Sequence, residues 1–197
     1  MKGRWVILPK EENIMTHVGT QMLETDRLIL RRYVSEDAPA KFRNWTSDPE
    51  VTKYLMWKTH PTPEYTQKIT DEWITHYSDN KRYHWAITLK ENGDEPIGDI
   101  AVVRMDEEVS SVHIGYCLGR KWWHKGIMSE ALKAVMDFMF DVVGVNRVES
   151  RHDPRNPNSG KVMQKCGMKY EGTLRQSDWN NQGICDACYY ALLKSER

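Results

Sequence analysis

The chain has 197 residues with 28 basic and 28 acidic side chains, so its formal net charge is zero. This length is typical of one domain that buries roughly 70% of the surface its unfolded form exposes. Zero net charge excludes a general attraction to nucleic acid or anionic lipid. No apolar run approaches the ~20 residues of a membrane span. We therefore expect a soluble, cytoplasmic protein with no direct nucleic-acid or membrane partner.

The four cysteines are scattered through the second half of the chain, at Cys117, Cys166, Cys185 and Cys188. A domain of this size needs no disulfides to complete its core, so we expect reduced thiols. Cys185 and Cys188 have the spacing of half a zinc site, but they lie in a predicted strand. Side chains three residues apart on a strand face opposite sides, so the sequence predicts no metal site.

Residues 1–21 carry no clear pattern and are predicted to be an N-terminal extension, followed by one domain over residues 22–197. The sequence leaves open whether the extension is a regulatory segment, a tag remnant or a dimer arm, which would make the protein a homodimer. Regular structure is predicted to begin in RLILRRY, residues 27–33, where apolar and polar residues alternate as in a strand.

Three helices are predicted to follow that first strand. Ser35, Asp48 and Thr62 are all helix-capping residue types, and acids or a proline follow each of them in the first turn. The third helix is expected over residues 63 to about 78, where apolar side chains recur at helical spacing.

The remainder of the chain predicts a mixed sheet. Three strand patterns separated by turns indicate an antiparallel meander: YHWAITLK (83–90), PIGDIAVVRM (96–105) and VSSVHIGYCL (109–118). A long helix from about 126 to 143 follows. Then come a strand at NRVESR (146–151), a helix near 156–165, and two strands, MKYEGTLRQSDW (168–179) and ICDACYYALL (184–193). This order predicts an α/β fold (a mixed α+β sheet) with helices on both faces.

A basic, aromatic turn, GRKWWHKG (119–126), precedes the long helix. Backbone N–H groups in the first turn of a helix lack intrahelical partners and favour a bound anion such as a phosphate. Gly126 would allow that anion to approach the backbone closely. A solvated surface turn is the alternative that spacing alone leaves open. Neither a Walker P-loop nor a GxGxxG dinucleotide loop fits the glycine spacing.

The stretch IGYCLGRKWWHKGIMSEAL resembles the coenzyme A loop of the GNAT superfamily of N-acetyltransferases, whose pattern is Q/R-x-x-G-x-G/A between a strand and a long helix. Two further stretches, LETDRLILRRY and RVESRHDPRNPNSGKVMQKCGMKYEGTLRQ, resemble the branch of ribosomal-protein N-terminal acetyltransferases of the RimJ/RimL type. The resemblance covers about residues 22–195. It implies an acyl-CoA N-acyltransferase fold, a mostly antiparallel sheet with splayed central strands, with acetyl-CoA as cofactor and an amine as acceptor.

Three positions depart from the family pattern. Trp123 stands where the general pattern has Gln or Arg, and Met128 stands where it has Gly or Ala. Met163 lies where many members carry a tyrosine that donates a proton. By the resemblance, Ser159 would take that role.

The resemblance implies a cofactor site along the basic turn and the start of the next helix, with the pantetheine arm beside the strand that ends at Leu118. Asn156 and Ser159 are three residues apart and share one helix face, although Asn156 is also a good N-cap. The residues so assigned to the cofactor are Cys117, Leu118, Trp123, His124, Lys125, Gly126, Ile127, Met128, Ser129, Asn156 and Ser159.

The general base is open between two carboxylates and water. The resemblance implies Asp178, seven residues after Glu171-Gly172, or its rival Glu149 on the preceding strand. Either acid could equally be a solvated surface group, and water could accept the proton from the amine.

The acceptor pocket is expected around the early helices and the last hairpin, with Trp57, Tyr65 and Trp179 as its aromatic lining; core packing explains each equally well. The expected activity is acetyl transfer to a protein N-terminal α-amine. A small-molecule amine as acceptor and a non-catalytic acyl-CoA-binding module are the two alternatives.

Overall fold

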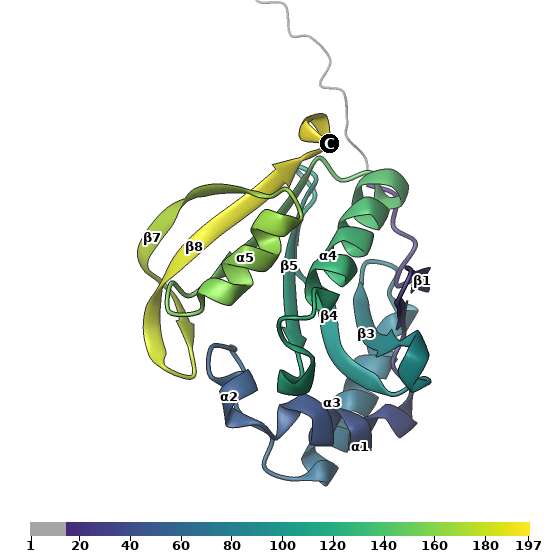
Figure 1. Cartoon of the computed structure of the whole chain (residues 1–197). Helices are drawn as coiled ribbons and strands as arrows, with labels where there is room; N and C mark the ends of the chain where they lie inside the picture. Colours follow the sequence, from purple (N-terminus) through teal and green to yellow (C-terminus); the bar gives the residue numbers. More distant parts are fainter. Residues whose placement is uncertain (1–14) are drawn as a thin grey trace, which may run out of the picture.

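The computed structural model describes residues 15–197. Eight strands form one sheet in the order β1-β2-β3-β4-β5-β6-β8-β7 (Figure 1). All neighbouring strands are antiparallel except β5 and β6, so the prediction of a mixed, mostly antiparallel sheet is confirmed. The strands are β1 Leu23–Glu24, β2 Leu28–Arg31, β3 His84–Leu89, β4 Pro96–Asp106, β5 Ser111–Leu118, β6 Arg147–His152, β7 Lys169–Asn180 and β8 Gly183–Leu193.

Five α-helices accompany the sheet: α1 Ala38–Lys41, α2 Pro49–Thr52, α3 Pro63–Thr75, α4 Ile127–Phe138 and α5 Pro157–Lys165. In Figure 1, α4 and α5 lie side by side across the sheet, while α1, α2 and α3 gather at its lower end. Short turns of 3₁₀ or π-helix complete the chain: η1 Ser35–Asp37, η2 Phe42–Thr46, η3 His76–Ser78, η4 Lys90–Asn92, η5 Arg120–Trp122, η6 Met139–Val143 and η7 Lys194–Glu196. Within residues 15–197, no helix has the length and apolar character that crossing a bilayer requires.

Two of the three predicted helix caps are confirmed. The Asp48 carboxylate accepts a hydrogen bond from the Glu50 amide at 3.0 Å, and the Thr62 hydroxyl accepts one from the Tyr65 amide at 3.2 Å. Ser35 is not a cap, because its hydroxyl donates instead to Asp71 on α3 at 2.6 Å. The long helix predicted over 126–143 is α4 continued by the π-helical turn η6.

Two apolar clusters cover the two faces of the sheet. Trp85 and Ile87 belong to the larger cluster, which packs under α4. Ala86, between them on β3, belongs to a second cluster with Tyr33 and Trp45 beside α1 and α3. Because consecutive residues of a strand face opposite sides, the sheet has an apolar layer on each face.

The two parallel strands separate at the centre of the sheet. β5 and β6 pair only from Ser111↔Arg147 to His113↔Glu149, although both strands continue beyond. The Ser150 hydroxyl donates to the Ile114 carbonyl at 2.7 Å where the ladder ends. The splayed central strands are therefore present, and they open the sheet between the first turns of α4 and α5.

The described part of the expected extension packs on the domain. Met15 is buried in the main core, and the Gly19 amide donates to the Asn80 carbonyl at 2.8 Å. The Trp85 indole donates to the Gln21 carbonyl at 2.6 Å. The domain boundary predicted at residue 22 thus falls inside a packed segment. The rest of the predicted N-terminal extension, residues 1–14, lies outside the described residues.

Cys185 and Cys188 lie on β8 as predicted. The Asn180 amide donates to Cys185 Sγ at 3.4 Å, and Cys188 Sγ lies 3.1 Å from the Thr173 hydroxyl. The two thiols therefore have separate neighbours on the β7–β8 hairpin and do not converge.

Candidate active site

Two cavities meet where the strands separate. The first, of about 290 Å³, lies between the first turns of α4 and α5. The second, of about 520 Å³, runs between the region of α3 and the β7–β8 hairpin. The residues that line both cavities form a junction, which we define as Leu55, Tyr116, Cys117, Asn156 and Ser159. One molecule in each cavity would bring their ends together at this junction.

The basic turn approaches the first cavity in a left-handed conformation. The backbone φ is +61° at His124 and +74° at Gly126, which is the N-cap of α4. The first intrahelical bond runs from the Glu130 amide to the Gly126 carbonyl at 3.1 Å. In the described chain, the amides of Ile127, Met128 and Ser129 have no hydrogen-bond acceptor, so the start of α4 presents three free donors.

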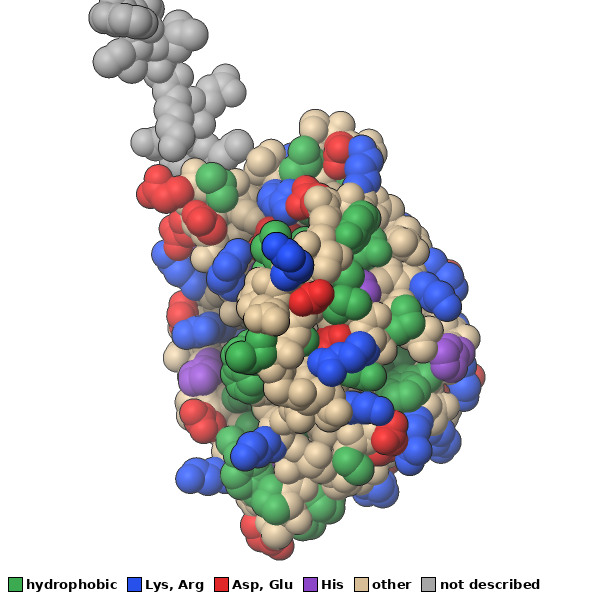
Figure 2. All heavy atoms as spheres, turned by 90° about the vertical axis from the view of Figure 1, so that its left-hand side faces the viewer, with side chains coloured by type: hydrophobic (Ala, Val, Ile, Leu, Met, Phe, Trp, Pro, Cys, Tyr) green, Lys and Arg blue, Asp and Glu red, His purple; other side chains and the backbone are tan. Residues whose placement is uncertain are grey.

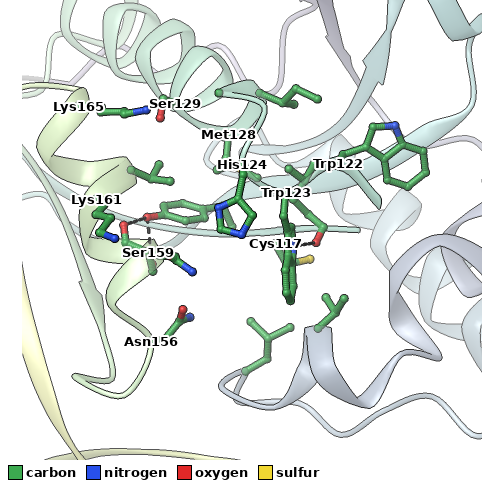
Figure 3. A pocket seen from close by; sticks show the side chains of 18 residues that line it. Cys117, Trp122, Trp123, His124, Met128, Ser129, Asn156, Ser159, Lys161 and Lys165 are labelled. Carbon is green, nitrogen blue, oxygen red and sulfur yellow. Dashed lines mark hydrogen bonds between the residues drawn. The ribbon is translucent and has the colours of Figure 1, made fainter. Parts of the chain in front are cut away.

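Two lysines from α5 extend this positive region. Lys161 and Lys165 are four residues apart, so they lie on one face of α5, and both line the first cavity. Figure 3 shows Lys165 extending from α5 towards Ser129 of α4. Neither lysine forms an ion pair within residues 15–197. The sequence analysis missed them, although their spacing just after Asn-x-x-Ser was a usable signal.

The predicted cofactor residues all line the first cavity except Lys125. The Lys125 carbonyl instead accepts a hydrogen bond from Arg27 Nη1 at 3.1 Å. The side chain of Met128 is buried in the main core, so its bulk is accommodated behind the loop. Trp123 closes the loop because its indole donates to the Leu118 carbonyl at 2.7 Å.

Ser159 has a tyrosine partner at the junction. Tyr116 Oη donates to the Ser159 carbonyl at 3.0 Å and lies 3.1 Å from the Ser159 hydroxyl. Burial raises the pKa of Tyr116 above its usual value despite this hydrogen bond. The first turn of α5 is held close to β6, since a Cβ on Gly160 would lie 2.5 Å from His152 Nε2. The sequence analysis did not identify Tyr116.

The end of β5 presents a backbone donor to the opening. The Gly119 amide donates to the Ile97 carbonyl at 2.8 Å, and Cys117 is opposite Asp99 in the same ladder. Antiparallel strands alternate the direction of their amides, so the Leu118 N–H points away from β4 and towards the separated strands. The Leu118 N–H can therefore donate to a ligand in this opening, which is the role predicted for the backbone near Leu118.

The second cavity contains two of the three predicted acceptor residues. Trp57 and Trp179 both line it. Tyr65 lies outside, on the outer part of α3, where its ring packs against His60 at 5.0 Å between centroids. The Asn181 side chain donates to the Trp57 carbonyl at 2.7 Å, which ties the β7–β8 hairpin to the loop after α2.

The two predicted base candidates are both held in ion pairs. Asp178 lines the second cavity and makes two contacts with Arg151, at 2.5 and 3.1 Å. Glu149 contacts His113 at 3.1 Å, Arg104 at 3.0 Å and Arg147 at 3.1 Å. The hydrogen bond from His113 is the main cause that lowers the pKa of Glu149 to about 2.

Glu149 lines neither cavity. A carboxylate with so low a pKa is a poor proton acceptor near neutral pH, because its conjugate acid forms only in strong acid. The geometry therefore argues against Glu149 as the base.

Figure 2 views the molecule from the side of β7 and β8, and on this face basic, acidic and hydrophobic side chains are interspersed. The positive charge gathered at the first cavity is a local feature, since the whole chain has a formal net charge of zero. A split sheet, free helix amides with two lysines, and a second cavity that meets the first indicate a transferase that binds a phosphate-bearing ligand beside a second substrate.

Comparison with known proteins agrees with this class. The family described as acetyltransferase (GNAT) domain matches residues 27–169, and the chain belongs to that family. It is therefore an N-acetyltransferase that uses acetyl-CoA.

Two similar relatives span different shares of the chain. The uncharacterized N-acetyltransferase p20 of Bacillus licheniformis is 34% identical over 180 residues, covering 89% of this chain and 98% of the relative. The [ribosomal protein uS5]-alanine N-acetyltransferase of Escherichia coli is 35% identical over 60 residues, covering 30% of this chain and 31% of that enzyme.

Two solved structures share the fold. A GNAT-family acetyltransferase from Bacillus anthracis superposes with a TM-score of 0.78 at 25% identity, covering 89% of this chain and 100% of its own. The microcin C7 self-immunity acetyltransferase MccE, solved in complex with acetyl-CoA and AMP, superposes with a TM-score of 0.76 at 18% identity, covering 86% of this chain and 93% of its own.

Proposed function

We propose that this enzyme acetylates the N-terminal α-amine of a protein chain, with the first cavity as the seat of acetyl-CoA and the second as the acceptor groove. The observation that carries the proposal is the shape of the second cavity. It holds about 520 Å³ and draws its lining from α3, the loop after α2, β4, β5 and the β7–β8 hairpin. A cavity of this size falls in the range of small-ligand sites, so it would hold the first residue or two of a peptide N-terminus. The uS5-alanine acetyltransferase that matches part of the chain supports the same acceptor class.

The residues present fit the cofactor. The free amides of Ile127, Met128 and Ser129 suit a pyrophosphate, and Lys161 and Lys165 add positive charge beside them. The part of the cavity lined by Leu118 and Asn156 would hold the pantetheine arm. When bound, acetyl-CoA supplies the acetyl group as a thioester.

The Leu118 amide is the donor that we assign to the carbonyl oxygen of that thioester. It lies at the end of β5, beside the junction, and points into the opening between the strands. A preorganised backbone N–H aimed at developing negative charge contributes more in a water-poor site than in bulk water. Trp123 supports this geometry, because its bond to the Leu118 carbonyl fixes the peptide on the other side of that residue.

Ser159 and Tyr116 form the proton donor in this proposal. Ser159 lies on the wall shared by both cavities, and its hydroxyl is within hydrogen-bond distance of Tyr116 Oη. Serine is a weak acid by itself, so a proton passed to the leaving sulfur would be replaced from the tyrosine, which would in turn regain its proton from water in the cavities. This pair takes the role for which Met163, fully buried in the core, has no suitable group.

An acceptor panel tests the proposed function. We would compare thiol release from acetyl-CoA for short peptides with free N-termini, the same peptides with blocked N-termini and a free lysine side chain, and small amines including a polyamine. The proposal expects the highest kcat/KM for free N-terminal peptides and no turnover of blocked ones. A higher kcat/KM for a small amine would refute the peptide acceptor in favour of a small-molecule one.

A further inference from the structure

The acceptor groove contains a histidine–carboxylate pair that the catalytic roles above leave unused. We propose that His84 and Asp99 are the proton acceptor for the incoming amine, an inference that rests on the proposed function of the groove. His84 Nε2 lies 3.5 Å from Asp99 Oδ2, and both residues line the second cavity.

The sheet register places this pair beside the junction. Asp99 on β4 is opposite Ala86 on β3 and Cys117 on β5, so the three residues form a row on one face. The Cys117 thiol donates to Asp99 Oδ1 at 3.1 Å. Since Cys117 belongs to the junction, the carboxylate is one side chain away from the place where the two cavities meet.

Small residues open the floor of the groove next to His84. Ala101 is opposite His84 across the β3–β4 ladder, and Gly115 is opposite Ala101 across the β4–β5 ladder. All three line the second cavity. An amine that moves along this face passes the imidazole, Ala101 and Gly115, with the Val103 side chain lying over Gly115.

The imidazole is fixed in orientation. Its ring centroid lies 4.3 Å from that of Trp73 at an interplanar angle of 54°, and 5.3 Å from that of Tyr33 at 72°. If Nε2 carries the proton that faces Asp99, Nδ1 has a free lone pair. Within residues 15–197, Nδ1 forms no hydrogen bond. A histidine held by a carboxylate on one nitrogen and open on the other has the geometry of a general base.

Asp99 is buried yet ionised. Burial alone would raise the pKa of its carboxyl group, but the hydrogen bond from His84, the positive charge that His84 carries once it is protonated, and the charge of Lys41 outweigh burial and lower the pKa overall. The Tyr33 hydroxyl also donates to Asp99 Oδ2 at 3.4 Å. The carboxylate can therefore stabilise the imidazolium that forms when His84 accepts a proton.

The other charged or titratable groups around His84 do not compete for this role. Lys41 Nζ is buried without a hydrogen-bond acceptor in the described chain and stacks 3.4 Å over the Trp73 ring; burial lowers the pKa of its ammonium to about 8. Burial raises the pKa of Tyr77 to about 12. Tyr33 contacts the imidazole edge-on, and His76, Arg82 and Cys117 line the same cavity.

The step itself is a simple proton transfer. One proton moves from the ammonium nitrogen to His84 Nδ1, and the electron pair of that N–H bond stays on nitrogen as the nucleophilic lone pair. Asp99 stabilises the resulting imidazolium, which returns the proton to water through the open groove. Asp178 and Glu149 are less suitable, since arginines already occupy their oxygens.

Two substitutions and two acceptors test the inference. We would measure kcat/KM of His84→Gln and Asp99→Asn with the best alkyl-amine acceptor of the panel, peptide or small molecule, and with hydroxylamine, which is already neutral at pH 7. His84→Gln should lose about 10²-fold or more with the alkyl amine, as expected for a lost general base, but less than about 10-fold with hydroxylamine. In Asp99→Asn, the acid limb of the pH–rate profile should move to lower pH, because the imidazolium loses its counter-charge.

The control measurements are acetyl-CoA affinity and thermal unfolding, neither of which should change greatly in His84→Gln. Equal losses with both acceptors would show that His84 only shapes the groove, and unchanged rates would exclude it altogether. If either variant fails to fold, His84→Asn with added imidazole gives the same test, since a lost base is rescued by the free base and a lost contact is not. Preference for a small amine over peptides would refute the proposed acceptor while leaving this comparison valid.

Discussion

Substitutions at Gly126 test the anion site, and they separate the effect of a negative charge from the effect of side-chain size. At its φ of +74°, asparagine and aspartate are the non-glycine residues best tolerated. A Cβ there would have only Arg27 Nη2 nearby, at 3.7 Å, so neither residue clashes. Gly126→Asn and Gly126→Asp therefore share their size and their backbone strain of about 1–2 kcal/mol, and they differ by one negative charge.

The charge should weaken cofactor binding by a predictable amount. A carboxylate about 5 Å from a phosphate costs about 3 kcal/mol at an effective dielectric constant of about 20. Arg27 would offset part of this cost, which leaves about 2 kcal/mol, or a Kd about 30-fold higher for Gly126→Asp than for Gly126→Asn. Calorimetric titration with coenzyme A measures the difference directly. It should shrink at high salt, because the loop is partly exposed.

The shape control is the asparagine variant. Gly126→Asn should bind coenzyme A within about threefold of the unsubstituted protein, since it leaves the amides of α4 in place, and should unfold at a slightly lower temperature. Equal affinities of the Asp and Asn variants would refute the reasoning, because a pyrophosphate could not then lie at the start of α4.

Three further predictions concern the junction and its surroundings. Ser159→Ala should lower kcat about 10²-fold with little change in acetyl-CoA affinity, and Tyr116→Phe should reproduce part of that loss; equal effects on turnover and affinity would contradict a proton-donor role. Asp178→Asn should keep the shape of the pH–rate profile but lower the unfolding temperature, because Arg151 loses its partner; a lost acid limb would restore Asp178 as the base. The depressed pKa of Glu149, about 2 against about 4.5 unfolded, adds stability that is present above pH 4.5 and lost as the pH falls towards 2. Glu149→Gln should therefore be less stable at pH 7 and lose less of its remaining stability in that acid range, as chemical unfolding at several pH values would reveal.

Local sequence signals led to the cofactor side of the proposed site. The glycine at 126 marks the end of the basic turn and the start of α4, and a helix start carries its free amides wherever it is placed. Asn156 and Ser159 could be assigned to one face of α5 from their spacing alone. The strand order of the meander also followed from alternation and turns, which are local properties.

The contacts that organise the acceptor side could not be predicted in the same way. Tyr116 meets Ser159 across 43 residues of chain, and Asn181 reaches Trp57 across 124. Such pairs depend on which strands become neighbours, and a single sequence does not encode that order locally. Tyr65 lies outside the second cavity for a related reason, since helical spacing indicates an apolar face but not which neighbour covers it.

The most direct test of the account is thiol release from acetyl-CoA in the presence of a pooled set of peptides and small amines, with the acetylated product identified by mass spectrometry. We predict acceptor-dependent release and a product acetylated at a peptide α-amine. Release that does not depend on any acceptor, or tight acetyl-CoA binding with no release at all, would contradict the claim that the two cavities meet at a catalytic junction.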